Sequence, residues 1–133
     1  MPMVNWLAVI AAALSMFVIG GIWYSPLLFD KAWRRAGNIS DADMARSNPA
    51  VIFGTAFVLT LIMAANLAFF IAGPETTLSF AIGAAVAAGF GWAALSVGVI
   101  TLFERRPLSY FLINGGYLTI GFAVMGLILG LWR

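Results

Sequence analysis

Four long apolar runs constrain this chain of 133 residues more than any other feature of its sequence. They cover about residues 4–24, 50–72, 78–103 and 108–132, and a helix of roughly 20 residues is enough to cross a bilayer. All seven Lys and Arg residues and all five Asp and Glu residues lie outside these runs or at their ends. Because soluble domains carry about 25% charged residues and this chain carries 9%, we predict a membrane protein.

The runs predict an all-α fold, an integral membrane bundle of four transmembrane helices that forms one domain over residues 1–133. They lack the alternation of polar and apolar residues that a β-barrel needs, and lipid admits only helices or closed barrels. The connections at residues 73–77 and 104–107 are short, so the last three spans should be antiparallel neighbours. The first run is longer than the roughly 7–15 residues of a signal-peptide core and lacks a preceding Lys or Arg, so we expect it to be retained as a span.

The basic residues predict the orientation. Arg133 follows the last span, while the other six basic residues lie in the first and third connections: Lys31, Arg34, Arg35, Arg46, Arg105 and Arg106. Basic loops stay on the cytoplasmic side of a membrane. We therefore expect a multi-pass protein of the bacterial inner membrane with both termini in the periplasm.

The first connection, residues 25–49, is the only long one, and its first half is predicted to form a short cytoplasmic helix from Ser25 to Gly37. Ser25 suits the N-cap position and Pro26 the first helical position. Gly37 suits the left-handed residue that follows a helix end. The sequence thus predicts a short amphipathic helix between the first and second spans.

This predicted helix has two chemically different faces, and Asp30 can pair with Arg34 one turn later. An amphipathic helix of this kind lies in the headgroup region, with its apolar side in the acyl boundary and its basic side on anionic lipid. Alternatively, the same residues pack beneath the helix bundle and the charges are merely solvated. The predicted membrane-interface residues are Trp23, Tyr24, Phe29, Lys31, Trp33, Arg34 and Arg35.

Two further helix starts are predicted in the second half of this connection. Ser40 and Asp43 resemble a capping box with Asp in place of the usual Glu. Asn48 and Pro49 are suited to cap and open the second span. Helix capping explains Asp41 and Asp43 better than metal binding does, because a calcium loop needs more oxygen ligands.

Several motifs spread along the chain resemble those of a known family. They are Asn5-Trp6, Gly20-Gly21-Ile22-Trp23-Tyr24-Ser25-Pro26 with Phe29 and Trp33 following, Asn114-Gly115-Gly116-Tyr117, and Gly126, Gly130 and Trp132. Together they resemble the small bacterial membrane family called domain of unknown function 1761, over almost the whole chain. The resemblance implies a four-span inner-membrane protein and supplies no activity, substrate or catalytic residue.

Neutral polar residues are the candidate site inside the membrane, because no Asp, Glu, Lys or Arg lies at depth in the four runs. One interpretation is that they hydrogen-bond between helices and fix how the helices align. The other is that they line a pocket or pathway for a small neutral or amphipathic solute. The indole N–H of one of them, Trp92, is expected to bond Ser96, Thr60 or Tyr117. The candidate intramembrane polar residues are Thr60, Asn66, Trp92, Asn114 and Tyr117.

Small residues on the third and fourth spans predict close helix packing. Gly83, Ala87 and Gly91 form a small-residue ridge on the third span, and Gly126 and Gly130 form a second motif on the fourth. Small residues let helix backbones approach closely. Since small residues surround the third span on every side, we expect neighbours on more than one side, and hence a homo-oligomer or a subunit of a larger membrane complex.

Two classes of function follow. The first is a non-enzymatic oligomeric protein with a structural or accessory role; the alternative is a small transporter or channel for a neutral or amphipathic solute. An enzyme is not expected, because His and Cys are absent and no buried carboxylate replaces them as base or nucleophile. No metal or cofactor is expected. Membrane lipids are expected partners and nucleic acid is not, because orientation and lipid contact account for a net charge of +2.

Overall fold

The structure, a computed structural model, describes residues 4–71, 73 and 75–132, and the long elements in this part of the chain are all helices. The four helices long and apolar enough to cross a membrane are α1 (Trp6–Trp23), α4 (Pro49–Ile71), the third span and α7 (Leu108–Leu131). The third span is one helix made of α5 (Leu78–Val86), η1 (Ala87–Ala94) and α6 (Leu95–Phe103). The predicted all-α bundle of four spans is confirmed; the expected end of the second span at Ala72 lies outside the described residues.

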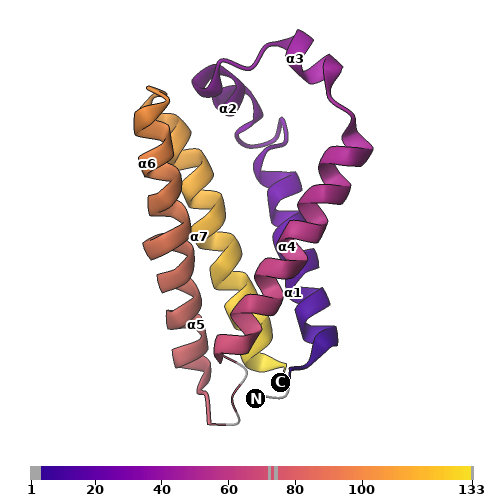
Figure 1. Ribbon diagram of the computed structural model, residues 1–133, viewed down its shortest axis with the longest axis vertical. Helices are drawn as coiled ribbons and strands as arrows, with labels where there is room; N and C mark the ends of the chain where they lie inside the picture. Colours follow the sequence, from indigo (N-terminus) through magenta and orange to yellow (C-terminus); the bar gives the residue numbers. More distant parts are fainter. Residues whose placement is uncertain (1–3, 72, 74, 133) are drawn as a thin grey trace.

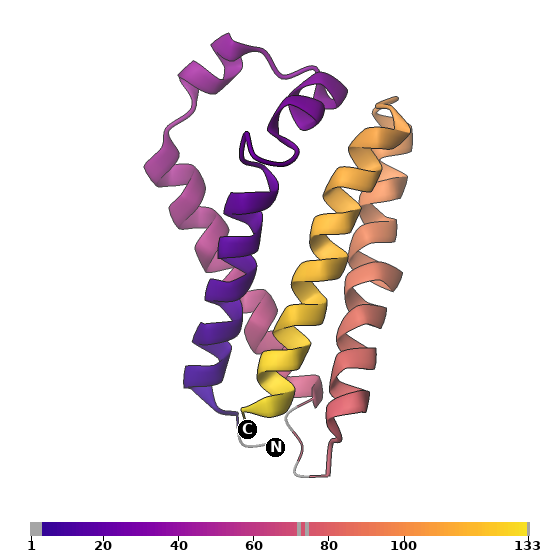
Figure 2. The same ribbon diagram turned by 180° about the vertical axis from the view of Figure 1, so that it is seen from behind.

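The helices stand side by side with both termini at one end and the long connection at the other (Figure 1). Helix α7 is central, because it packs against α1 on one side and against α5, η1 and α6 on the other. Helix α4 packs mainly against α1 and diverges from the third span toward the end that carries α2 (Asp30–Gly37) and α3 (Asp41–Arg46), as Figure 2 also shows. The third span and α7 are antiparallel neighbours, as their short connection predicted.

Side-chain caps explain why three spans begin where they do. The Asn5 carboxamide oxygen accepts the N–H groups of Leu7 and Ala8 at the start of α1. At the start of α4, Asn48 accepts the N–H group of Ala50 at 3.1 Å, and Thr77 caps α5 in the same way. These bonds satisfy N–H groups that have no partner within the helix. The prediction that Asn48 and Pro49 open the second span is confirmed.

The short helix predicted between the first and second spans differs from its prediction at both ends. Helix α2 begins at Asp30, not at Ser25, because the Ser25 side chain and carbonyl organise a turn instead: the hydroxyl donates to Ile22 and accepts the Leu27 N–H. At the other end Asn38, with φ 54°, is the left-handed residue, and Gly37 is the last helical one. Asn tolerates this conformation better than most side chains.

The third span and α7 approach each other through small residues. A Cβ added at Gly126 would lie 2.4 Å from the Ala85 Cβ, and one at Gly130 would lie 3.0 Å from the Ala81 Cβ. A Cβ at Gly89 would lie 2.5 Å from the Phe122 Cβ. The predicted packing role of Gly126 and Gly130 is therefore confirmed, with Ala81, Ala85 and Gly89 as the facing residues.

The predicted ridge on the third span lies on the opposite side of the helix. Gly83, Ala87 and Gly91 are exposed, and no atom lies within 4 Å of a Cβ added at Gly83 or Gly91. Within the described chain these residues therefore pack against no other helix. Their role in packing between subunits stays a prediction.

A π-helical segment, η1, changes which residues of the third span face α7. The buried positions Ala81, Ala85 and Gly89 are spaced by four, whereas the next one, Ala94, follows after five. The wider turn of a π-helix accommodates one extra residue. It thereby keeps small residues on the α7 side along the length of the span.

Candidate functional site

The turn that follows α1 is held against α7 by a tryptophan. The Trp23 indole N–H donates to the Ile113 carbonyl at 2.8 Å, and the ring centroids of Trp23 and Phe29 lie 4.8 Å apart. A Cβ added at Gly116 would lie only 3.0 Å from the Trp23 ring, so a glycine at this position gives the indole room. These contacts fix where the chain leaves the first span.

The next residue, Tyr24, joins the turn to the polar side chains of α7. Its hydroxyl donates to the Asn114 carboxamide oxygen at 2.6 Å. Its ring packs edge-on against Tyr117, at 5.5 Å between centroids, and against Trp33, at 5.3 Å. Tyr117 in turn lies against Gly20, where an added Cβ would meet its ring at 3.1 Å. Asn114 and Tyr117, predicted as intramembrane polar residues, thus belong to one cluster with Tyr24 and Trp33.

The end of α2 is tied to the connection between α6 and α7. The Arg106 guanidinium donates to the Gly37 carbonyl, and its carbon lies 5.0 Å from the centroid of the Tyr110 ring. A Cβ added at Gly37 would lie 2.8 Å from that ring. Arg106 also pairs with Glu104 at 3.3 Å. Two connections far apart in sequence are therefore joined through one arginine.

These contacts decide how the aromatic face of the short helix is used. Phe29 and Trp33 pack on Trp23 and Tyr24 beneath the bundle, as the alternative interpretation predicted. The turn before the helix nevertheless leaves Leu27 86% exposed, so an apolar side chain remains available to lipid. The interfacial interpretation accordingly fits the leucine and the charged residues better than it fits the two aromatic rings.

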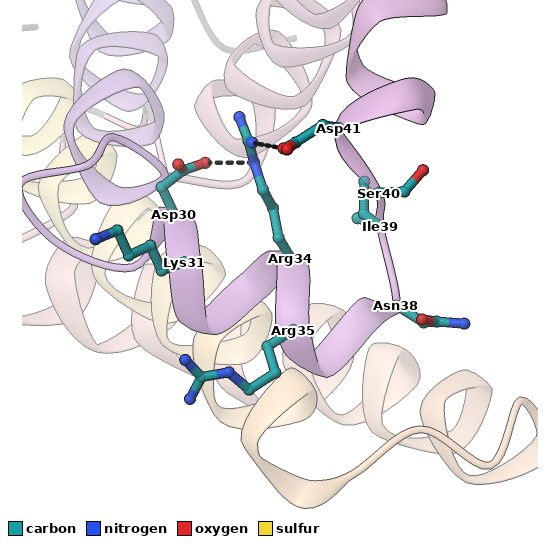
Figure 3. Close-up of a pocket in the computed structure, with 8 residues that line it drawn as sticks. All are labelled: Asp30, Lys31, Arg34, Arg35, Asn38, Ile39, Ser40 and Asp41. Atoms are coloured by element: carbon teal, nitrogen blue, oxygen red, sulfur yellow. Dashed lines mark hydrogen bonds and ion pairs between the residues drawn. The ribbon is translucent and has the colours of Figure 1, made fainter.

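The charged residues around α2 do not act alike. Arg34 pairs with Asp30 and with Asp41 at 3.1 Å each, which confirms the predicted pair with Asp30 and joins α2 to α3 (Figure 3). Lys31 and Arg35 are exposed and point away from this bridge, as Figure 3 shows. A hollow of about 520 Å³ lies here, lined by Asp30, Lys31, Arg34, Arg35, Asn38, Ile39, Ser40 and Asp41.

The capping box predicted at α3 is present. The Ser40 hydroxyl accepts the Asp43 N–H, and the Asp43 carboxylate accepts the Ser40 N–H at 2.9 Å. The backbone and side chain of Ser40, and then Arg46, hold the pKa of the Asp43 carboxyl below its usual range. The carboxylate therefore has a structural role, as the sequence predicted.

The other predicted intramembrane polar residues do not join the cluster. Thr60 donates to the carbonyl of Ala56 at 2.7 Å, and Asn66 to that of Ile62 at 3.2 Å, so each bonds its own helix. Trp92 is 75% exposed on the outside of the third span. Its expected bond to Ser96, Thr60 or Tyr117 is absent from the described residues, because η1 turns the indole away from the bundle.

A hollow of about 330 Å³ lies beside the cluster, between the end of α1, α6 and the first half of α7. Tyr24, Asn114 and Tyr117 form its polar side, and Glu104 is the one charged residue among those that line it. The full lining is Tyr24, Val97, Ile100, Thr101, Glu104, Tyr110, Asn114, Tyr117 and Leu118. Polar and aromatic groups thus meet aliphatic ones, a composition suited to an amphipathic molecule.

Sequence reasoning did not predict that Arg106 joins Gly37 to Tyr110, or that Tyr24 pairs with Asn114. A signal was present, because the two most specific motifs of the family resemblance are those that touch. In the run Asn114-Gly115-Gly116-Tyr117, the first residue bonds Tyr24, Gly116 accommodates Trp23 and Tyr117 packs on Tyr24. Both motifs belong to the same family resemblance although they are about 90 residues apart. A contact between them could have been predicted for that reason.

Comparison with known protein families gives a match over most of the chain. The family model described as "Protein of unknown function (DUF1761)" matches residues 7–130, which is most of the chain. No curated protein and no solved structure matches.

Proposed function

Because this chain belongs to the DUF1761 family of proteins of unknown function and carries four membrane-length helices, we propose that it is a non-enzymatic protein of the bacterial inner membrane. It acts as a structural or accessory subunit, in a homo-oligomer or in a larger membrane complex. One observation carries this proposal: the ridge of Gly83, Ala87 and Gly91 faces outward.

This ridge is suited to packing against a helix of another subunit. The space beside Gly83 and Gly91 is open. On the same span the side chains of Phe80 and Phe90 are also uncovered, at 58% and 51% exposed. In lipid, helices associate through close van der Waals contact, which small residues permit by letting backbones approach. A partner helix would cover both the ridge and the neighbouring aromatic side chains.

A transport pathway through the bundle receives less support. Thr60 and Asn66 bond carbonyls of their own helix, and Trp92 points outward, so the predicted polar residues do not line one route.

The proposal of a non-enzymatic role rests on composition, because the sequence has neither His nor Cys. The acid Glu104 is engaged by Arg106.

The oligomeric state tests the proposal. The full chain is purified in mild detergent, its mass is measured by light scattering, and native membranes are crosslinked in parallel. We expect the wild type to be oligomeric and Gly83→Leu with Gly91→Leu to weaken the assembly. Gly21→Leu is the matched control, because an added Cβ there also meets nothing within 4 Å. A monomeric wild type, or an assembly that the ridge variant leaves intact, contradicts the proposal.

The proposed orientation places both termini in the periplasm, and it rests on the six basic residues of the first and third connections. The reporter is a phosphatase that is active only in the periplasm. Fused to the C-terminus, it is expected to be active. A fusion at the connection between α6 and α7 is expected to be inactive. The reverse pattern would refute the orientation while leaving the oligomer proposal to its own test.

A further inference from the structure

The hollow lined by Tyr24, Asn114 and Tyr117 contains hydrogen-bond donors that the protein does not use. The Asn114 carboxamide oxygen accepts the Tyr24 hydroxyl, and the Asn114 amide N–H groups have no partner among the described residues. The same holds for the hydroxyls of Tyr110 and Tyr117 within residues 4–71, 73 and 75–132. In that part of the chain every fully buried side-chain N or O atom has a hydrogen-bond partner, so a polar atom without one is not fully buried. These three residues are half-buried, so their unused donors must be accessible from outside the protein.

The depth of these donors favours a partner from the membrane. Tyr110, Asn114 and Tyr117 lie roughly 3, 9 and 14 Å from the start of α7, at a rise of about 1.5 Å per residue. This range covers the cytoplasmic edge and upper part of the hydrocarbon layer of about 30 Å. Water is scarce at the depth of Asn114 and Tyr117, and an unsatisfied polar group is costly there.

The remaining lining defines the chemistry of that partner. The one charged residue that lines the hollow, Glu104, is paired with Arg106, so an ionic ligand finds no free opposite charge. Val97, Ile100 and Leu118 provide apolar surface. Three residues with spare donors favour a ligand with acceptor oxygens, and carbonyl groups provide such acceptors without charge.

We propose that this hollow binds the carbonyl-bearing head of a neutral amphipathic molecule of the membrane. The volume of about 330 Å³ is near the lower limit of ligand pockets, about 300 Å³, so it holds a head group while the apolar tail stays in the bilayer. Tyr110, Asn114 and Tyr117 donate to the carbonyl oxygens. This inference goes beyond the proposed function and does not depend on the oligomeric state.

Such a head has two sources in a membrane, the ester carbonyls of a glycerolipid and the ring carbonyls of a quinone. The full chain, exchanged into fresh detergent, is titrated with 1,2-dioctanoylglycerol and separately with decylubiquinone. The comparison compound is 1-dodecanol, which has a hydroxyl and a tail but no carbonyl. Thermal unfolding followed by circular dichroism reports binding, because a ligand specific for the folded state raises Tm with concentration.

The expected result is a saturable rise in Tm with at least one carbonyl probe, larger than with 1-dodecanol; the stronger probe identifies the source. Tyr110→Phe and Tyr117→Phe keep the rings and remove one donor each, and each should weaken binding about 3- to 10-fold. Thr119→Val is the control, because that hydroxyl bonds Gly115 and does not line the hollow. Equal shifts for carbonyl probes and alcohol, or unchanged affinity in both Phe variants, would overturn the proposal.

Discussion

Replacing Gly126 by Ala tests the close approach of α7 to the third span. The added Cβ would lie 2.4 Å from the Ala85 Cβ and 3.0 Å from the Ala81 carbonyl oxygen. Neither atom is at the far end of a flexible side chain, so the two helices must move apart. Gly54→Ala on α4 is the matched control, because a Cβ there meets nothing within 4 Å.

The magnitude follows from the difference between the two variants. Both gain the helix propensity of Ala over Gly, about 1 kcal/mol, so this contribution cancels in the comparison. Overpacking a well-packed interface costs about 1–3 kcal/mol. Gly126→Ala should therefore be less stable than Gly54→Ala by about 1–3 kcal/mol, and Gly54→Ala should be at least as stable as the wild type.

Unfolding by SDS in mixed micelles, followed by tryptophan fluorescence, gives the free energy of unfolding of each variant. The two alanine variants are compared in one detergent mixture, so that the reference unfolded state is the same. If Gly126→Ala is as stable as Gly54→Ala, the backbones are farther apart than described, and the reasoning on small residues at this interface is refuted.

Two further predictions concern the end of the bundle that carries α2 and α3. Tyr24→Phe removes the hydroxyl that bonds α7 and keeps the ring; the free energy of unfolding should fall by about 0.5–1.5 kcal/mol, measured in the same SDS titration, and an unchanged value would contradict the bond. The pKa of Asp43 is lowered by its bonds to Ser40, so its stabilisation of α3 is present above the ordinary aspartate pKa and is lost as the pH falls through the lowered value. Amide exchange in α3 measured against pH should show this loss in the wild type and not in Asp43→Asn.

The parts of the fold that sequence reasoning predicted depend on local signals. The capping box of Ser40 and Asp43 is complete within four residues, and Asn48 bonds the N–H two residues after it. The four spans follow from apolar length alone. Such features do not depend on which helices are neighbours, and they can therefore be predicted from the sequence.

The face of the third span that packs against α7 could not be predicted in this way. Small residues surround this helix, so Gly83 and Ala85 are equally plausible contacts by composition, although only Ala85 faces α7. The π-helical segment η1 then shifts the buried face by one residue, which a regular helical spacing does not anticipate. It also turns Trp92 outward, away from the polar residues with which it was grouped.

The cluster formed by Tyr24, Trp33, Asn114 and Tyr117 could not be predicted without the tertiary fold. Tyr24 and Asn114 are about 90 residues apart, and neither carries a local pattern that identifies the other. The sequence predicts Gly37 as a helix terminator, whereas in the structure its missing side chain makes room for Tyr110. A glycine thus has the same appearance in sequence whether it ends a helix or accommodates a ring.

The most direct test of the proposed packing between subunits is a cysteine scan along residues 80–91 of the third span in native membranes. The chain has no Cys of its own, so each variant carries a single thiol. Disulfide-linked dimers are expected to peak at Gly83→Cys, Ala87→Cys and Gly91→Cys and to be minimal at Ala85→Cys and Gly89→Cys, which face α7. Dimer formation that peaks at positions 85 and 89, or that shows no periodicity, would contradict the account.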